Sequence, residues 1–259
     1  MQFSLFELPG KHTGKYLLYQ LSLRTMGQKK LKRFAEIKTF ANVLEYPEDM
    51  AGKWKNFFNN DHPITLELAC GRGEYTVGLA RLHPHQNFIG VDIKGNRMYI
   101  GARQCLQENL HNGAFLRTQI EMINRYFAPG EVDAIWITFP DPQLRTSKAK
   151  KRLTHPRFLR LYRQFLKTGG TIHLKTDSPQ LFQFTKRVIE LYGLLLVEEN
   201  DDVYKKQPVP EELTIKTHYE SLDIAQSKRV HYLKFSLPET IKDIDDQLQE
   251  ILRNEEQTD

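Results

Sequence analysis

The 259-residue sequence has few of the features that mark disulfide-rich, metal-binding or membrane proteins. Its two cysteines, Cys70 and Cys105, are too few for a disulfide framework or a cysteine-based zinc cluster. No apolar run approaches the roughly 18 residues of a transmembrane helix, and the N-terminus lacks the charged-then-apolar pattern of a signal peptide. Internal repeats and low-complexity tracts are also absent. We therefore expect a reduced, cytoplasmic protein with no metal site and no membrane partner.

Acidic residues are missing from one long stretch of the chain. Between Pro142 and Thr176 there is no Asp or Glu, but there are ten cations: Arg145, Lys148, Lys150, Lys151, Arg152, Arg157, Arg160, Arg163, Lys167 and Lys175. The last 22 residues, from Pro238, have the opposite bias, with eight acids and two bases. The net charge is only +5, so it is the segregation that indicates a polyanionic partner. A solvated helix face is the alternative for the basic stretch.

From Ile64 onwards, short apolar runs alternate with helix-like stretches. Strands are expected at Ile64–Cys70, Asn87–Ile93, Ala114–Thr118, Val132–Phe139, Thr171–Lys175, Leu194–Glu198 and Val230–Leu237. Helices are expected at Glu74–Leu82, Asn96–Leu110, Pro156–Leu166 and Pro179–Tyr192. Apolar strands separated by helices are typical of a parallel sheet covered on both faces. The pattern predicts an α/β fold with a mostly parallel, seven-stranded sheet and helices on both faces.

The two ends of the chain differ from this central region. The first 60 residues are polar, basic around Lys29–Arg33 and without a clear strand, so we expect an extension there. Near the other end, four apolar residues recur close to helical spacing, which predicts an acidic amphipathic helix docked on the domain: Ile241, Ile244, Leu248 and Ile251. The predicted division is an extension at 1–60, a domain at 61–237 and a helix at 238–259.

The segment LELACGRGEYT follows an expected strand and begins an expected helix. Gly71 and Gly73 permit a tight turn and the close approach of a ligand to the backbone. Thr76 stands where a dinucleotide-binding GxGxxG motif has its third glycine, which weakens the case for NAD. Glu67 instead completes the pattern E/D-x-x-x-G-x-G of S-adenosylmethionine-dependent methyltransferases. A purely structural Glu67 is the alternative, since a buried acid needs a partner.

Polar residues follow the next two expected strands. Asp92 ends the segment IGVDI, about 20 residues after the glycines, where a carboxylate can accept hydrogen bonds from both ribose hydroxyls. NAD and S-adenosylmethionine both contain a ribose, so Asp92 predicts an adenosine site without choosing the cofactor. Its alternative role is to cap the helix expected at Asn96. Gln119, after the third expected strand, is the candidate contact to adenine.

Asp141 lies between two prolines at the end of the fourth expected strand, VDAIWITFPDP. Proline disfavours helical geometry in the preceding residue, so Phe139 and Asp141 are expected to be extended. The carboxylate is then held on stiff backbone at the sheet edge that faces the ligand crevice of doubly wound folds. The Asn/Asp-Pro-Pro-aromatic motif of many amine methyltransferases and the Pro-Cys of pyrimidine C5 methyltransferases are both absent.

Four segments occur in the order FPDP, KKRLTHPRFL, GGTIHLKTD and TIKTHYE. Together they resemble the bacterial tRNA (guanine-N7)-methyltransferase family, over a region from about Phe34 to Leu237. The resemblance implies a Rossmann-like class I methyltransferase fold and S-adenosylmethionine as the methyl donor. It also implies that the acceptor is N7 of guanine 46 in the variable loop of tRNA.

The resemblance implies roles for individual residues. Cofactor contacts are implied for Glu67, Asp92, Gln119 and Asp141, beside the loop glycines Gly71 and Gly73. Substrate contacts are implied for Arg145, Asp177, Thr217, His218, Tyr219 and Glu220. The neighbouring cations are expected to hold RNA phosphates: Lys148, Lys150, Lys151 and Arg152. Arg157, Arg160 and Arg163 recur at helical spacing and are expected to extend that basic surface.

Four positions depart from the family pattern. Gln143 stands in place of a Trp that is usual there, so the aromatic side chain that could stack on a base is missing. Arg145 and Lys148 stand where Lys and His are usual, and Gln119 where an acid is common.

The chemistry of the acceptor agrees with these residues. Guanine N7 has an in-plane lone pair and no proton to remove, so methylation requires positioning and desolvation rather than a strong base. The product is a cationic purine, which a preorganised carboxylate stabilises. Asp141, the catalytic candidate, and Asp177 suit this role. For the segment KTDSP the alternative is a helix cap formed by Asp177 or Ser178.

Two other functions stay open at this point. One is an RNA-binding module that has the methyltransferase fold but impaired catalysis. The other is an NAD-dependent oxidoreductase, although hydride transfer gives no reason for the basic run. The sequence does not distinguish a monomer from a homodimer.

Overall fold

The computed structural model describes residues 31–258, with gaps at 206, 223–225 and 227. Residues 1–30, half of the expected N-terminal extension, lie outside the described residues. The strands are β1 (Val43–Glu45), β2 (Ile64–Leu68), β3 (Asn87–Asp92), β4 (Gly113–Arg117), β5 (Val132–Thr138), β6 (Leu166–Thr176), β7 (Leu195–Asn200) and β8 (His231–Ser236). The α-helices are α2 (Trp54–Phe58), α3 (Glu74–Leu82), α4 (Gly95–Gln107), α5 (Pro156–Arg163), α6 (Pro179–Tyr192), α7 (Glu211–Thr214) and α8 (Asp245–Thr258). The 3₁₀ helices are η1 (Ile120–Arg125), η2 (Thr146–Lys151) and η3 (Glu220–Leu222), and residues 31–37 are also helical.

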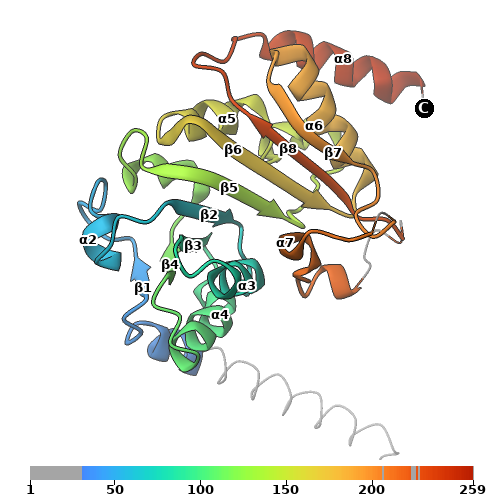
Figure 1. The fold of residues 1–259 in the computed structure, drawn as a ribbon. Coiled ribbons are helices and arrows are strands. Elements are labelled where there is room, and N and C mark those ends of the chain that lie inside the picture. The colour runs from blue at the N-terminus through green and yellow to red at the C-terminus, as the bar shows by residue number, and fades with distance from the viewer. Residues whose placement is uncertain (1–30, 206, 223–225, 227, 259) are drawn as a thin grey trace, which may run out of the picture.

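One sheet runs through the molecule in the order β1-β4-β3-β2-β5-β6-β8-β7 (Figure 1). All neighbouring strands are parallel except β8, which is antiparallel to both β6 and β7. The seven strands expected from the sequence are all present, and the α/β fold class is confirmed. The strand count was one too low, because β1 pairs in parallel with β4 at the edge of the sheet.

The expectation that no strand lies within the first 60 residues is therefore wrong. Besides β1, the short helix α2 belongs to the core, because Trp54 is fully buried and stacks on Phe127 with ring centroids 5.3 Å apart. The Trp54 indole also donates a hydrogen bond of 2.7 Å to the carbonyl of Tyr126. A three-residue strand is too short to show the alternation by which strands are recognised in sequence.

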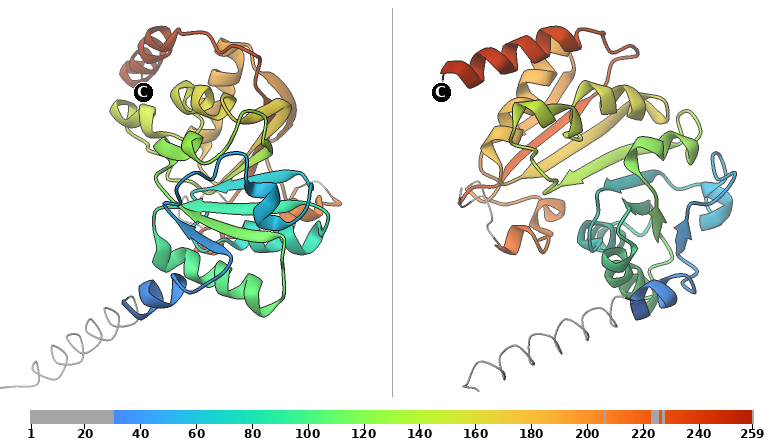
Figure 2. Two further views of the ribbon diagram at one scale, coloured as in Figure 1. Left: turned by 90° about the vertical axis from the view of Figure 1, so that its left-hand side faces the viewer. Right: turned by 180° about the vertical axis from the view of Figure 1, so that it is seen from behind.

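Helices cover both faces of the sheet (Figure 2). On β5, Ile135 and Ile137 point to the core shared with α2, α5, α6 and α8. Trp136, between them, points to the opposite face, where α3 and α7 pack. The helix at 31–37 and α4 form a third cluster around Phe115. Both faces are therefore buried, which explains the nearly continuous apolar strands.

The ends of the central helices follow from their capping residues. Ser178 caps α6 by accepting a hydrogen bond of 3.2 Å from the amide of Leu181, and Pro179 occupies the first turn. His155 caps α5 through Nδ1, which accepts from the amide of Arg157 at 3.1 Å. Of the two candidate caps in the segment KTDSP, Asp177 and Ser178, it is therefore Ser178 that caps α6.

The acidic helix expected near the C-terminus is present but starts later than its apolar pattern indicated. Since α8 begins at Asp245, Ile241 and Ile244 precede it. Leu248 is buried as expected, and Leu252, rather than Ile251, is the second buried residue of the helix. Within the described residues, no helix combines the length and apolarity that crossing a membrane requires.

Candidate active site

A cavity of about 990 Å³ opens at the carboxyl ends of the parallel strands. Seven of the residues singled out in the sequence line it: Gly71, Asp92, Gln119, Asp141, Lys151, Asp177 and Tyr219. They come together because parallel strands end at the same edge of a sheet, where ligands of doubly wound folds bind. The cavity therefore brings part of the predicted cofactor set together with part of the predicted substrate set.

Asp92 is held at the wall of the cavity by two backbone amides. Its Oδ2 accepts a hydrogen bond of 2.9 Å from Gly71, and its Oδ1 accepts one of 2.8 Å from Lys94. Each carboxylate oxygen keeps a further lone pair for a ligand hydroxyl. Helix α4 has no side-chain cap, so Asp92 does not serve as the N-cap considered above. The carboxylate, the apolar Ile93 and the amide of Gln119 suit the ribose and adenine of S-adenosylmethionine.

Gly71 provides room in the cavity beside Asp92. Its φ is +57°, in the left-handed region that glycine adopts without strain. A Cβ at this position would lie 3.7 Å from the ring of Tyr219 and would narrow the space between them.

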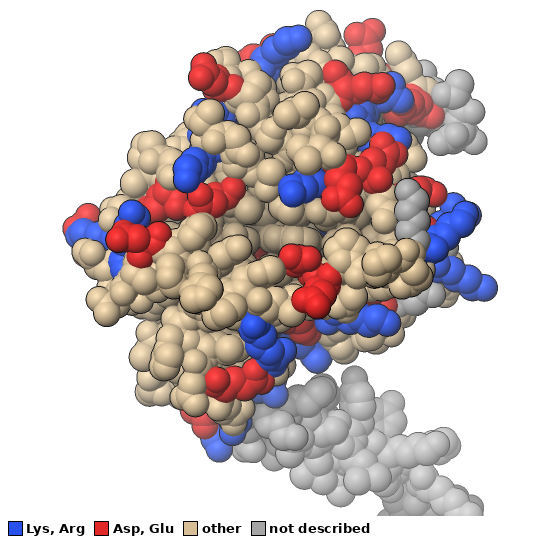
Figure 3. Space-filling model, viewed as in Figure 1, with Lys and Arg blue, Asp and Glu red and all other residues tan. Residues whose placement is uncertain are grey.

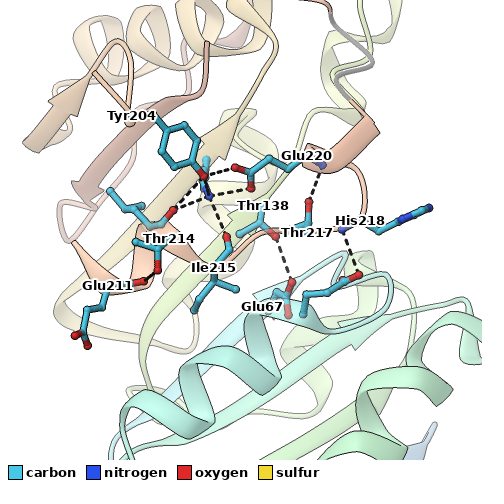
Figure 4. Close-up of polar contacts among 12 residues, drawn as sticks. Glu67, Thr138, Tyr204, Glu211, Thr214, Ile215, Thr217, His218 and Glu220 are labelled. Carbon is cyan, nitrogen blue, oxygen red and sulfur yellow. Dashed lines mark hydrogen bonds and ion pairs between the residues drawn. The ribbon is translucent and has the colours of Figure 1, made fainter. Parts of the chain in front are cut away.

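Glu67 and Gly73 lie behind the cavity wall rather than in it. Glu67 is buried, and its Oε2 accepts from the amide and the hydroxyl of Thr76 at 2.7 and 2.6 Å. Its Oε1 accepts from the Thr138 hydroxyl at 3.2 Å (Figure 4). Burial raises the pKa of Glu67 to about 8. The side chain thus joins β2, β5 and α3, and direct contact with the cofactor stays a prediction.

Gly73 has a packing role. A Cβ at this position would lie 2.4 Å from the ring of Phe115, so a side chain here would clash with that ring of β4.

Asp141 is exposed within the cavity, and its Oδ1 accepts a hydrogen bond of 3.0 Å from the amide of Gln143. The extended conformation expected for Phe139 is wrong, because its φ is +45°. Phe139 still donates the last sheet bond, 2.8 Å long, to the carbonyl of Lys175. Its ring is buried in the cluster that contains Trp136. The chain therefore turns sharply at Phe139, so that the ring enters the core while Asp141 lies in the cavity.

Most of the basic stretch is occupied within the protein. Arg152 is only 5% exposed and donates to backbone carbonyls of the loop after Asp141, so it stabilises that loop. Arg160 pairs with Asp245 of α8 at 2.5 Å, and Arg163 donates to the carbonyl of Leu166. The expectation that Arg157, Arg160 and Arg163 form one basic surface is therefore wrong. Arg157 is exposed and lies 3.9 Å from a carboxylate oxygen of Glu121.

Four exposed cations remain, and in the described part of the chain none of them has an acidic partner: Arg145, Lys148, Lys150 and Lys151. All four belong to η2 or directly precede it. On the face of the molecule shown in Figure 3, acidic and basic side chains are interspersed. The tertiary structure thus reduces a long basic stretch to one short group beside the cavity.

A buried ion pair attaches the segment 217–220 to strand β6. The ammonium of Lys175 is fully buried and lies 3.0 Å from Oε2 of Glu220. It also donates to the carbonyls of Leu213 and Ile215, at 2.8 and 3.0 Å. Figure 4 shows Tyr204 beside Glu220, to which its hydroxyl donates. Burial lowers the pKa of Lys175, and the carboxylate of Glu220 counteracts this.

The four residues of this segment have different environments. Tyr219 lines the cavity, where Arg97 donates to its hydroxyl and lies 5.6 Å from its ring centroid. Thr217 is buried and accepts from the amide of Glu220 at 3.0 Å. The amide of His218 donates to Glu74 at 3.3 Å. Of the four, Tyr219 alone is among the residues that line the described cavity.

Sequence reasoning missed two side chains that shape the site. Lys175 was counted among cations for a polyanion, although an ionisable residue inside an apolar strand signals a buried partner. No sequence pattern indicates the role of Arg97, because its contact with Tyr219 joins positions 122 residues apart.

This chain is similar to known proteins over most of its length. A family model described as "Putative methyltransferase" matches residues 61–233. A tRNA (guanine-N(7)-)-methyltransferase from Bacteroides thetaiotaomicron is 51% identical over 223 residues, covering 83% of this chain and 88% of the relative. One from Christiangramia forsetii is 46% identical, covering 82% and 100%.

Among solved structures, the 16S rRNA methyltransferase KamB is similar with a TM-score of 0.56 and 14% identity, covering 76% of this chain and 99% of that one. At this identity the similarity supports the fold, that of class I S-adenosylmethionine-dependent methyltransferases. With the family model matching two thirds of the chain and relatives at about half identity, the chain belongs to the tRNA (guanine-N7)-methyltransferase family.

Proposed function

We propose that this protein transfers a methyl group from S-adenosylmethionine to N7 of a guanine in tRNA, and that the target is guanine 46 of the variable loop. The observation that supports this most directly is the shared cavity of Asp92, Asp141 and Asp177. One carboxylate suits a ribose, and the other two lie where the acceptor base would enter. Family membership supplies the identity of the reaction.

The cofactor residues are proposed from their positions in the cavity. Asp92 would bind the ribose hydroxyls, Gln119 would contact adenine, and Gly71 would give the methionine part access to the backbone. When bound, S-adenosylmethionine supplies an electrophilic methyl group on a sulfonium. Glu67 and Gly73 would support this half of the site indirectly, by fixing the start of α3.

The acceptor residues are Asp141 and Asp177, at the ends of β5 and β6. Guanine N7 needs no general base, so we propose that these side chains orient the base and stabilise the positive charge that forms on it. Asp141 is suited to this because the amide of Gln143 and the adjacent prolines fix its position. Tyr219 and Arg97 would close the cofactor side of the cavity.

The exposed cations of η2 would hold the tRNA backbone. Phosphate contacts position an RNA without reading its sequence, and Lys151 connects this group to the cavity. We also propose a cytoplasmic protein that acts on tRNA as a monomer or homodimer, with no DNA or membrane partner. Its proposed division is an extension, residues 1–60, a catalytic domain, 61–237, and the C-terminal helix, 238–259.

The test is methyl transfer from labelled S-adenosylmethionine to a tRNA transcript, with the modified nucleoside identified by mass spectrometry. We expect 7-methylguanosine, and its loss when guanine 46 is replaced by adenine. Label found only on another base or on protein would refute the proposal. Tight tRNA binding without turnover would instead indicate an RNA-binding module.

A further inference from the structure

The loop that follows Asp141 is fixed by a buried cation. The guanidinium of Arg152 donates to the carbonyls of Pro142, Gln143 and Leu144 at distances between 3.1 and 3.3 Å. The central guanidinium carbon of Arg152 also lies 4.4 Å from the centroid of the Phe184 ring. Burial of a charged group is costly unless its hydrogen bonds are made. Arg152 therefore holds this loop in one conformation.

This conformation separates the two residues at the tip of the loop. Gln143 has a φ of +48° and turns the chain, and its side chain is not among those that line the cavity. Leu144 lines the cavity and is 61% exposed. Many surface leucines need no explanation. Leu144 differs from these because it lies on the loop that Arg152 fixes. It also lines the cavity that contains Asp141, Lys151 and Asp177.

The surroundings of Leu144 have the chemistry of a purine site. Apolar side chains that also line the cavity include Pro142, Leu153 and Phe158. Its polar groups include the carboxylates of Asp141 and Asp177 and the ammonium of Lys151. A base that leaves an RNA stack loses the contact of its two faces with neighbouring bases, and apolar side chains replace that contact. Polar groups then meet only its edge.

We propose that Leu144 is a substrate-positioning residue whose side chain lies against a face of the acceptor base. The proposal rests on the proposed function. It adds to that function the residue whose side chain replaces the neighbouring bases on one face of the acceptor base. Leu144 shields one face of the base from water, while the carboxylates of Asp141 and Asp177 contact its edge. Gln143, two residues after Asp141, shapes the loop through its backbone and leaves the contact to Leu144.

Leu144→Ala and Leu144→Phe test this, with Leu195→Ala as the matched control. Leu195 is 66% exposed on β7 and does not line the described cavity. We expect Leu144→Ala to lower kcat/KM for tRNA by about tenfold, the usual effect of losing one apolar contact. Leu144→Phe should stay within about threefold of wild type. Thermal stability and affinity for S-adenosylmethionine should be unchanged in all three variants, because Leu144 is exposed and belongs to the acceptor side.

A second measurement is independent of turnover. A tRNA with 2-aminopurine at the target position becomes more fluorescent when that base leaves the stack of neighbouring bases. Wild type should raise its emission, and Leu144→Ala should raise it less, because the unstacked base loses the apolar side chain that holds it.

Full activity of Leu144→Ala, together with an unchanged probe signal, would overturn the proposal. If wild type changes the probe signal more than Leu144→Ala does but transfers no methyl group, the proposed function fails while the base contact stands. If wild type does neither, both fail.

Discussion

Lys175 and Glu220 form an ion pair inside the protein, with the ammonium nitrogen 3.0 Å from the carboxylate. Their side chains are 0% and 5% exposed, and they lie 45 residues apart in the chain. The pair connects the end of β6 to the segment that places Tyr219 over Gly71. One side of the cofactor cavity is thus attached to the sheet through a buried ion pair.

Removal of Lys175 should destabilise the protein strongly. Lys175→Met leaves the Glu220 carboxylate buried without its cation, which costs about 3–5 kcal/mol of unfolding free energy. Urea unfolding measures this. The double variant Lys175→Met/Glu220→Leu should recover part of the loss, since no charge is then left unpaired. Lys186→Met, which breaks an exposed pair with Glu199, is the control and should change stability by less than about 1 kcal/mol. Equal effects of the two Lys variants would contradict the prediction.

Replacing the carboxylate of Asp141 should slow methyl transfer with little effect on the fold. In Asp141→Asn the side-chain oxygen can still accept from the amide of Gln143, but the negative charge is lost. We expect kcat to fall by about 10²–10³, as when one preorganised electrostatic contact is removed. Single-turnover kinetics with saturating cofactor and tRNA measure it. Asp61→Asn, which changes an exposed pair with Lys55, should be fully active. A drop of less than threefold would exclude an electrostatic role for Asp141.

The exposed cations of η2 should contribute to tRNA affinity through phosphate contacts. Lys148→Gln or Lys150→Gln should weaken binding and lower the slope of log K against log salt by about 1 each. Filter binding at several salt concentrations gives both quantities. Lys186→Gln has the same charge change at a residue paired with Glu199 and should leave the slope unaltered. Unchanged slopes in all three variants would place the RNA elsewhere.

The buried carboxyl of Glu67 should make the protein less stable as pH rises. Burial raises its pKa from 4.5 to about 8. Between these values the unfolded state loses the proton and the folded state keeps it, so the unfolding free energy falls with rising pH. The loss from this group is about 3 kcal/mol between pH 5 and 7.5. Glu67→Gln has no proton to lose, and its urea unfolding should show a shallower decline over this window. An identical decline would show that Glu67 is ionised in the folded protein.

His155 should act in the opposite direction below neutral pH. Burial lowers its pKa from 6.5 to about 4, so between these values the unfolded state binds a proton that the folded state does not. Unfolding free energy therefore falls as pH drops through this window, by up to about 3 kcal/mol. Asn can also cap α5 but does not titrate, so His155→Asn should remove part of this acid sensitivity. His173, whose pKa burial lowers to about 3, accounts for a further part. The measurement is thermal unfolding from pH 4.5 to 7, and an unaltered profile in the variant would contradict it.

Much of the site followed from the sequence because it depends on local pattern. Apolar runs located seven of the eight strands, and parallel strands expose their carboxyl ends at one edge. Residues at or just after the ends of those strands, such as Asp92, Gln119, Asp141 and Asp177, therefore share a cavity. The cap of α6 also depends on neighbouring residues, since the segment KTDSP supplies Ser178 as the cap and Asp177 to the cavity.

The tertiary structure alone decided which charged groups are available. Arg152 and Lys175 belong to the same basic stretch as Lys150, yet the first two are buried and the third is exposed. Arg160 meets its acid in Asp245, 85 residues away. Glu67 and Gly73 match a cofactor motif but lie behind the cavity wall. The physical reason is that strand and helix periodicity is written in adjacent residues, whereas burial and ion pairing depend on which distant segments the fold brings into contact.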